Sequence, residues 1–238
     1  MEITKIEPCS WFVGTKSKEL QLLVYGEGMN GTSIDVGIPY SKLDVSQTDD
    51  GKYILIKLNL DASLKEGKYR LDFHKGGKTI NIEYEFRQKK KWQHQSPTIS
   101  NDDVIYMLMP DRFAKDCRIG CSQEGIDENN PNTWHGGNIA GMTKALDYIS
   151  WLGFAAVWHT PIFKCSDYHG YSIEDFYNID SHFGNLDDYR MFVDSAHSKG
   201  LKVVMDIILN HCSIDHPWMQ ALPQKDWMNG AKETFEKT

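Results

Sequence analysis

Apolar and polar residues alternate along the first part of the chain, and this period of two predicts β-strands. In residues 53–60, every second side chain is apolar and faces the same way. These side chains are Ile54, Ile56, Leu58 and Leu60. Residues 69–86 repeat the alternation on both sides of Gly76-Gly77, which predicts a hairpin with a two-residue turn. Its expected inward positions are Tyr69, Leu71, Phe73, Ile80, Ile82, Tyr84 and Phe86.

Several short strands with glycine-containing turns are typical of an immunoglobulin-like β-sandwich, which we predict over residues 1–88. The next stretch, residues 89–102, is polar and basic with one proline. This composition predicts a solvated linker between two domains.

From residue 103 onward, continuous apolar runs alternate with amphipathic segments. The apolar runs predict strands at 104–109, 154–158 and 201–206, and the segments between them predict helices at 138–153 and 185–200. A strand–helix–strand–helix–strand order implies right-handed crossovers and a parallel sheet.

Both predicted helices carry clear end signals. Asn138 and Asn185 are expected N-caps, and Gly153 and Gly200 are expected to end the helices. The first helix has an apolar stripe that should face the sheet. The stripe consists of Ile139, Met142, Leu146, Ile149 and Leu152.

Polar residues follow each of the three predicted parallel strands. The first strand leads to Asp111 and Arg112, and the second to His159 and a long loop, 159–184. The third ends in a last group of polar residues, which are Asp206, Asn210 and His211. Because the carboxyl ends of parallel strands share one edge of a sheet, we expect these side chains and the loop to form a functional site.

Each of these residues also has a structural interpretation. Asp206 could hydrogen-bond neighbouring strand ends, and His211 could be a structural histidine. Asn210 could cap a loop or offer an oxygen to calcium. Tyr171 could serve packing alone. A tyrosine, a histidine and a glycine crowded in residues 168–171 also suit a platform on which a sugar ring stacks.

Composition narrows the range of partners. The formal net charge is −7 and no basic face is evident, so a nucleic-acid partner is not expected. No apolar run reaches 18 residues, so no membrane span is expected. The first ten residues lack the apolar core of a signal peptide, which leaves cytoplasm and bacterial periplasm both open.

The five cysteines are an odd number without regular spacing, which argues against a disulfide framework. The pair in residues 117–121, CRIGC, has the spacing of a metal half-site. No second half-site of matching spacing is present, so free thiols are the favoured interpretation.

Four motifs together resemble the α-amylase family of glycoside hydrolases, family 13. They are MPDRFA (109–114), HGGNIAGMTKALDYISWLGFAAVWHTPIF (135–163), YHGYSIEDFYNIDSHFGNLDDY (168–189) and DIILNH (206–211). Residues 6–26 resemble the amino-terminal sandwich of the cyclomaltodextrinase, maltogenic amylase and neopullulanase subgroup. The resemblance covers nearly the whole chain, and it implies glycosidase activity on α-1,4 or α-1,6 bonds of cyclodextrins, pullulan, starch or maltooligosaccharides.

The resemblance also implies roles for individual residues. His169 and His211 would hydrogen-bond the sugar on the non-reducing side of the cleaved bond, and Tyr171 would stack on it. Asp206 would support the site and would not be the nucleophile. The family uses a retaining mechanism with two close carboxylates.

The family's catalytic carboxylates follow the fourth, fifth and seventh barrel strands, and no position in this chain matches them. A whole (β/α)8 TIM barrel takes about 250 residues, more than follow residue 102 here. We therefore expect an incomplete barrel, with its first three strands and two helices over 103–211. Residues 212–238 would begin a small inserted domain, and the chain alone would be inactive.

Calcium is a weaker implication of the resemblance. Relatives with a calcium site use Asn and Asp in the loop after DRFA and the Asp of a GGD motif, where this chain has Lys115-Asp116-Cys117 and GGN (136–138). Asn210, Asp116 and Asn138 remain the candidate oxygen ligands, and no organic cofactor is expected.

The expected partners are α-glucan oligosaccharides and a second copy of the parent enzyme, bound as a homodimer through the amino-terminal sandwich. A different class of function also fits the sequence. The chain could be a non-catalytic carbohydrate-binding or assembly module whose working part is the sandwich.

Overall fold

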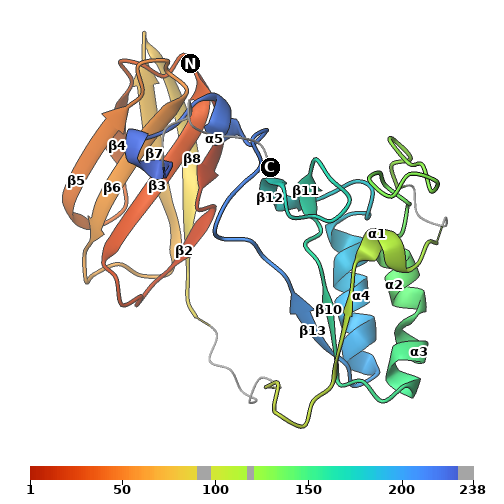
Figure 1. The fold of residues 1–238 in the computed structure, drawn as a ribbon. Helices are drawn as coiled ribbons and strands as arrows, with labels where there is room; N and C mark the ends of the chain where they lie inside the picture. The colour runs from red at the N-terminus through yellow and green to blue at the C-terminus, as the bar shows by residue number, and fades with distance from the viewer. Residues whose placement is uncertain (90–97, 117–120, 230–238) are drawn as a thin grey trace. The chain divides into compact units, whose positions relative to one another are not determined.

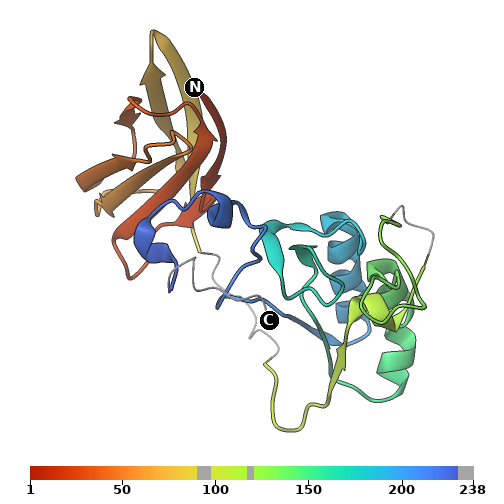
Figure 2. The same cartoon turned by 45° about the horizontal axis from the view of Figure 1, so that its top comes forward.

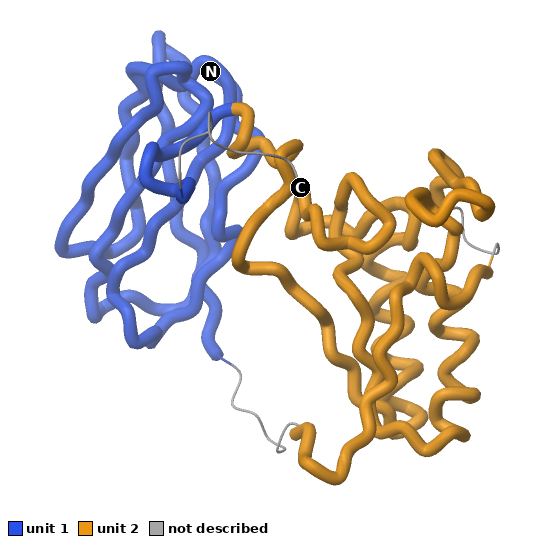
Figure 3. Tube along the Cα trace, viewed as in Figure 1, with its two compact units in different colours: residues 1–93, 221–238 blue, residues 94–220 orange. Residues whose placement is uncertain are grey.

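The computed structural model describes residues 1–89, 98–116 and 121–229. The chain divides into two compact units. The first comprises Met1–Gln93 with Ala221–Thr238, and the second comprises His94–Gln220 (Figure 3). None of the helices in the described ranges is long and apolar enough to cross a bilayer. The predicted domain boundaries stay predictions, and most of the predicted linker lies outside the described residues.

Alternating apolar residues build two four-stranded sheets in the first unit (Figure 1). One sheet has the order β1-β3-β6-β5 and the other the order β2-β8-β7-β4. The strands are β1 (Glu2–Glu7), β2 (Ser10–Phe12), β3 (Glu19–Glu27), β4 (Ser33–Val36), β5 (Tyr40–Gln47), β6 (Tyr53–Leu60), β7 (Gly67–Lys75) and β8 (Lys78–Arg87). All pairs are antiparallel except β2 with β8, which run parallel.

A single apolar core joins the two sheets. Ile54 and Ile56 of β6 belong to the same buried cluster as Phe73 of β7 and Phe86 of β8. Because both sheets contribute inward side chains to one cluster, the first unit is a β-sandwich, as the alternation predicts. Ile80 and Ile82 are only partly buried at its rim.

The β7–β8 hairpin turns at the predicted glycines. Lys75 pairs with Lys78, so the loop between them has two residues. Gly76 and Gly77 have φ values of 56° and 75°. A turn that needs positive φ at both central positions favours glycine strongly, which is why the sequence signal was reliable here.

The second unit contains a parallel sheet in the order β13-β10-β9. Its strands are β9 (Ile105–Leu108), β10 (Ala156–His159) and β13 (Lys202–Met205). Its helices are α1 (Pro110–Phe113), α2 (Ile139–Lys144), α3 (Leu146–Trp151), α4 (Leu186–Ser198) and α5 (Pro217–Gln220). A short 3-10 helix, η1 (Lys225–Trp227), follows in the part of the chain assigned to the first unit. The predicted strands, their parallel direction and the helices between them are confirmed.

Figures 1 and 2 show α2, α3 and α4 on one side of this sheet. Leu108 and Val157 point toward the helices and pack against Ile149 and Phe192 in one buried cluster. On the opposite face, the register partners Met107 and Trp158 are 54% and 37% exposed. The sheet is therefore covered on one face only within the described chain.

Three details of the sequence prediction are wrong. The single helix expected over 138–153 is two short helices, because the backbone turns at Ala145 between α2 and α3. Leu152 is 42% exposed, because α3 ends one residue before it. The loop 159–184 contains two antiparallel strands, β11 (Phe163–Cys165) and β12 (Ile173–Ile179), whose pairing is interrupted by irregular register.

Candidate functional site

Asp111, which follows β9, is buried and binds backbone amides. Asp111 is 2% exposed, and its carboxylate accepts hydrogen bonds from the backbone N–H groups of His135 (2.9 Å) and Gly136 (3.0 Å). The guanidinium of Arg112 pairs with the same carboxylate and lies 4.1 Å from the ring centre of Tyr168. Asp111 therefore holds the backbone of residues 135–136, and Arg112 contacts the segment between β11 and β12 through Tyr168.

His159, at the end of β10, is also structural. It is fully buried on the helix side of the sheet, and its Nε2 lies 2.9 Å from the hydroxyl of Tyr189 in α4. Its Nδ1 lies 2.8 Å from the carbonyl of Thr160, so Nδ1–H donates and Nε2 accepts. Burial lowers the pKa of His159, which keeps it neutral.

The four residues predicted to share a site do converge. The hydroxyl of Tyr171 donates to Asp206 Oδ2 at 3.3 Å, and His211 Nε2 lies 3.2 Å from the carbonyl oxygen of Tyr171. The rings of His169 and Tyr171 have centroids 5.7 Å apart. Asp206 and His211 follow β13, while His169 and Tyr171 lie between β11 and β12. The convergence predicted from strand-end placement is thus present in the second unit.

The half-buried hydroxyl of Tyr171 is held by its carboxylate partner. Burial raises the pKa of Tyr171, and the charge of Asp206 and the hydrogen bond to it act in the same direction. Tyr171 therefore stays protonated and donates to Asp206. This contact fixes the direction of the tyrosine ring at the edge of the site.

The turn that carries His169 and Tyr171 requires a glycine. Gly170 has a φ of 82°, and a Cβ at this position would meet the carbonyl oxygen of Pro161 at 2.0 Å. The backbone N–H of Gly170 also donates to Asp167 Oδ1 at 3.0 Å. The turn is thus pressed against the segment after β10, which sets the position of both aromatic side chains.

The two site histidines differ in their free nitrogens. His211 Nε2–H donates to the Tyr171 carbonyl, and its Nδ1 lies 3.3 Å from Asn210 Nδ2, so both ring nitrogens are engaged. In His169 only Nδ1 has polar partners among the described residues, with Asp167 Oδ1 at 2.7 Å and the Tyr171 N–H at 3.2 Å. Within the same ranges, no polar group contacts His169 Nε2, which is therefore available to a ligand.

Of the three calcium candidates, Asn138 has its side-chain oxygen engaged in protein hydrogen bonds. Asn138 Oδ1 caps α2 by accepting from the Gly141 N–H at 2.9 Å, and its Nδ2 donates to the Asp116 carbonyl at 2.9 Å. Asn210 contacts His211 through its Nδ2, not through its oxygen. No group of three or more His, Cys, Asp or Glu with metal-binding geometry occurs in the described ranges. The engaged oxygen of Asn138 does not favour a calcium ion at this position, and calcium binding stays an untested prediction.

Among the described cysteines, the buried Cys165 is a protonated thiol. Cys9, Cys165 and Cys212 are free thiols, while Cys117 of the CRIGC pair lies outside the described residues. Burial and the nearby Asp180 raise the pKa of Cys165. Its thiol therefore stays protonated and donates to the carbonyl of Asp167 at 3.1 Å.

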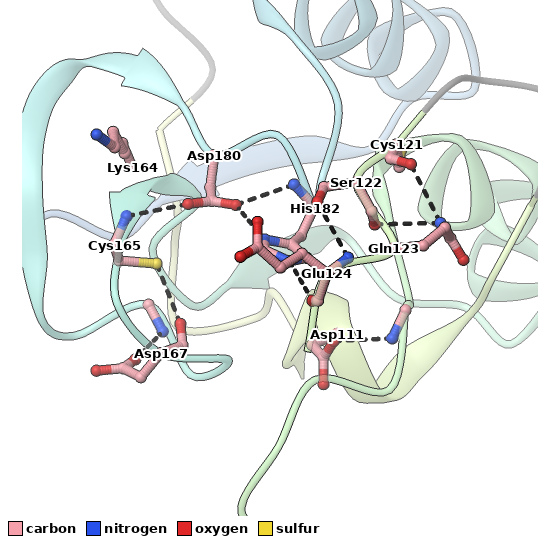
Figure 4. Close-up of polar contacts among 12 residues, drawn as sticks. Asp111, Cys121, Ser122, Gln123, Glu124, Lys164, Cys165, Asp167, Asp180 and His182 are labelled. Atoms are coloured by element: carbon pink, nitrogen blue, oxygen red, sulfur yellow. Dashed lines mark hydrogen bonds and ion pairs between the residues drawn. The ribbon is translucent and has the colours of Figure 1, made fainter. Parts of the chain in front are cut away.

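Sequence reasoning missed a cluster formed by Trp134, Asp180 and His182 (Figure 4 labels the latter two). His182 Nδ1 lies 2.7 Å from Asp180 Oδ1, and the indole of Trp134 stacks on the imidazole with centroids 3.9 Å apart and planes 8° from parallel. Asp180 Oδ2 also accepts from the Cys165 N–H at 3.1 Å. The only signal in the sequence was the Asp-x-His spacing within the 168–189 motif.

Two protein-family models match the chain. The family model described as alpha amylase, catalytic domain, matches residues 107–236, which is more than half of the chain. A second model, described as cyclomaltodextrinase, N-terminal, matches residues 5–90. The chain belongs to the α-amylase family.

Among curated relatives, "Alpha-amylase 2" of Dictyoglomus thermophilum is 32% identical over 72% of this chain and 29% of its own length. "Neopullulanase 2" of Thermoactinomyces vulgaris is 34% identical over 59% of this chain and 25% of its own length. "Cyclomaltodextrinase" of Geobacillus thermopakistaniensis is 32% identical over 57% and 25%. The chain thus spans less than a third of the length of these relatives.

A solved structure of an Anoxybacillus α-amylase is also similar. It shares 42% sequence identity with a TM-score of 0.52, over 55% of this chain and 29% of that chain. The subgroup inferred from residues 6–26 agrees with the second family model and with the names of the relatives.

Proposed function

We propose that the protein to which this chain corresponds is a retaining glycosidase that acts on α-linked glucans, and that this chain supplies part of its sugar-binding site. Relatives named cyclomaltodextrinase and neopullulanase support the substrate class. The observation that carries the proposal is the meeting of Tyr171, Asp206 and His211 beside an uncommitted His169 Nε2. A partly exposed ring beside a free imidazole nitrogen suits a sugar that stacks and hydrogen-bonds at once.

The contacts support a role for each residue in this proposal. Tyr171 would stack on one sugar ring while Asp206 accepts the hydrogen bond of the tyrosine hydroxyl. His169 Nε2 would bind a sugar hydroxyl directly. His211 would act mainly by holding the Tyr171 carbonyl, because both of its nitrogens are engaged. Asp206, occupied by a tyrosine hydroxyl, suits support better than nucleophilic attack.

In this proposal, the parallel strands are the first three of a (β/α)8 barrel and the sandwich is of the immunoglobulin type. Retaining hydrolysis needs a nucleophile and an acid–base about 5 Å apart. These two carboxylates would come from later strands of the longer protein. The residues after His211 would open a small inserted domain, and two copies of the parent would pair through their sandwiches.

Glucan binding tests the proposal. Titration calorimetry with maltotetraose should show weak binding by this chain, and Tyr171→Ala should weaken it about tenfold, the effect of losing roughly 1.4 kcal/mol of stacking. Tyr177→Ala, which removes a 46% exposed tyrosine of β12, is the matched control and should leave binding unchanged. Equal affinity of the wild type and Tyr171→Ala would reject the stacking role.

Hydrolysis tests the assignment of the catalytic groups. A reducing-sugar assay on maltooligosaccharides should detect no turnover by this chain, because positioned sugar without a nucleophile and a proton donor does not react at a useful rate. Turnover comparable to that of a full-length relative would contradict this. Asp206→Asn would then show whether Asp206 is the nucleophile after all.

A further inference from the structure

His182 is held between two groups that can only accept hydrogen bonds. Its Nδ1 lies 2.7 Å from Asp180 Oδ1, and its Nε2 lies 2.8 Å from the backbone carbonyl oxygen of Glu124. A carboxylate and a carbonyl have no proton to give, so both imidazole nitrogens must donate. An imidazole that donates from both nitrogens is an imidazolium, so the geometry alone assigns a positive charge to His182.

The surroundings of His182 favour this charge. Burial by itself lowers the pKa of His182, but the hydrogen bonds to Asp180 and to the Glu124 carbonyl, and the negative charges of Asp180 and Asp111, outweigh it and raise the pKa. Asp111 is itself paired with Arg112. The indole of Trp134 covers one face of the imidazolium, an arrangement that stabilises a cation.

The paired carboxylate connects this charge to the loop that carries the candidate site (Figure 4). Asp180 Oδ2 accepts from the N–H of Cys165, the last residue of β11, at 3.1 Å. The thiol of Cys165 then donates to the Asp167 carbonyl at 3.1 Å. Asp167 Oδ1 lies 2.7 Å from His169 Nδ1, so direct contacts link His182 to His169.

On its other side, His182 holds the segment 121–135. The Glu124 carbonyl and the Trp134 ring both belong to this segment, and the N–H of Ser122 donates to the carbonyl of Ser181 at 2.9 Å. The charged His182 side chain thus contacts residues 121–135 directly and β11 through Asp180.

We propose that Asp180 and His182 are a pH-sensitive positioning pair for residues 166–172, the loop that carries His169 and Tyr171. The proposal rests on the proposed glucan binding. When His182 loses a proton to solvent, one of its two hydrogen bonds is lost and Asp180 loses its counter-charge. Asp180 then holds the Cys165 amide in a looser arrangement, and the loop binds glucan less well.

The same cluster is not a nucleophilic triad, although it contains a cysteine, a histidine and an aspartate. The Cys165 thiol donates to a carbonyl and contacts neither ring nitrogen of His182 in the described structure, and burial raises its pKa. A protonated, buried thiol is a poor nucleophile. Positioning is therefore the role that the contacts support.

Histidine NMR and amide hydrogen exchange on this chain test the pair without needing enzymatic activity. At about pH 7, long-range ¹⁵N spectra should show both ring nitrogens of His182 protonated, although ordinary histidine is mostly neutral there. As pH rises above the ordinary histidine pKa of about 6.5, the protection of the Cys165 and Ser122 amides, corrected for intrinsic exchange, should fall roughly tenfold as His182 titrates. The amide of Ile149, within α3, should show no such change.

Two variants distinguish a specific effect of His182 from a general loss of stability. His182→Gln should lower protection of the Cys165 amide, because glutamine gives Asp180 no positive partner. It should also remove the pH dependence, because glutamine does not titrate. His197→Gln, which removes an exposed histidine of α4, should leave the pH dependence intact. A singly protonated His182 at neutral pH, or pH-independent protection of Cys165 in the wild type, would overturn the proposal.

Maltotetraose titration over the same range distinguishes the two proposals. Affinity should fall several-fold as His182 loses its proton, in parallel with the loss of Cys165 protection. Binding that stays constant while protection falls would overturn the positioning role. Absence of binding at every pH, with Cys165 protection still following the protonation of His182, would reject the glucan function. It would leave the effect of the positioning pair on the loop supported.

Discussion

In the first unit, each four-stranded sheet covers the inner face of the other, whereas in the second unit the described residues cover only one face of the three-stranded sheet, with helices. Phe73 and Phe86 are almost fully buried between the two sheets of the sandwich. Met107 and Trp158, on the uncovered face of the parallel sheet, remain 54% and 37% exposed. The same kind of apolar strand residue is thus a core residue in one unit and a surface residue in the other.

This difference shows what alternation along a strand can and cannot predict. It predicts which side chains share a face, but whether that face is covered depends on other elements. In β6 the residues on the predicted face are buried, and so are Tyr53 and Leu55 on the opposite one. In β9 and β10 the continuous apolar run predicts cover on both faces, and among the residues that the structure describes only the helix side has it.

Core truncation should produce the largest difference between the two units. Phe73→Ala removes a fully buried ring from the sandwich and should lower the free energy of unfolding of the first unit by about 3–5 kcal/mol. Trp158→Ala removes a larger ring from the uncovered sheet face and should cost far less. Urea titrations that follow each unit by hydrogen exchange measure both values. A loss above 3 kcal/mol for Trp158→Ala would show that this face is covered in solution.

The second unit should also depend on pH through two histidines with opposite shifts. The raised pKa of His182 gives stability that is fully present below the ordinary histidine pKa of about 6.5 and is lost as pH rises through the folded value. The lowered pKa of His159 acts the other way, because stability is lost as pH falls below about 6.5. Wild type should therefore exceed His182→Gln in stability most clearly below about pH 6.5, and the gap should narrow at higher pH.

Urea unfolding of the wild type and of His182→Gln across this pH range measures the difference in their stability. The contribution of His159 is common to both and cancels. A gap that widens with rising pH would mean that His182 is neutral in the folded chain. In the first unit, the described groups with shifted pKa values are acids, a lysine and a tyrosine, none of which titrates near neutrality. Its stability should accordingly change little over the same interval.

The sequence predicted those parts of the structure that depend on neighbouring residues. The hairpin turn needs positive φ at Gly76 and Gly77, and the caps need a side-chain acceptor at Asn138 and Asn185, so both signals lie within a few residues. The convergence of Tyr171, Asp206 and His211 followed from the rule that parallel strands end at one edge. The particular hydrogen bonds between them could not be read from that rule.

The sequence failed where distant segments decide the outcome. The contacts of His182 with Glu124 and Trp134 join residues about fifty positions apart, and no local pattern marks them. Asp111 and His159 also follow strands, as site residues should, yet one holds backbone amides and the other faces α4. Position at a strand end selects candidates, and only the direction of the side chain separates site from support.

The smallest effect expected here comes from the two helix caps of the second unit, and it compares an exposed end with a buried one. Asn185 Oδ1 accepts from the N–H groups of Asp187 (2.9 Å) and Asp188 (3.1 Å) at an exposed end of α4. Asn185→Ala should therefore cost about 1 kcal/mol, the usual value for a lost cap.

Asn138, 2% exposed, caps α2 and in addition bonds both backbone groups of Asp116, so Asn138→Ala should cost about 2 kcal/mol, since it leaves buried polar groups unsatisfied. Asn138→Asp is the informative partner, because aspartate keeps the cap but cannot donate to the Asp116 carbonyl. Thermal unfolding of each variant with calcium and with a chelator measures these costs. If the Asn138 side chain itself ties Asp116 to the helix, wild-type stability should not change with calcium. A rise in wild-type stability with calcium would show that an ion shares this role.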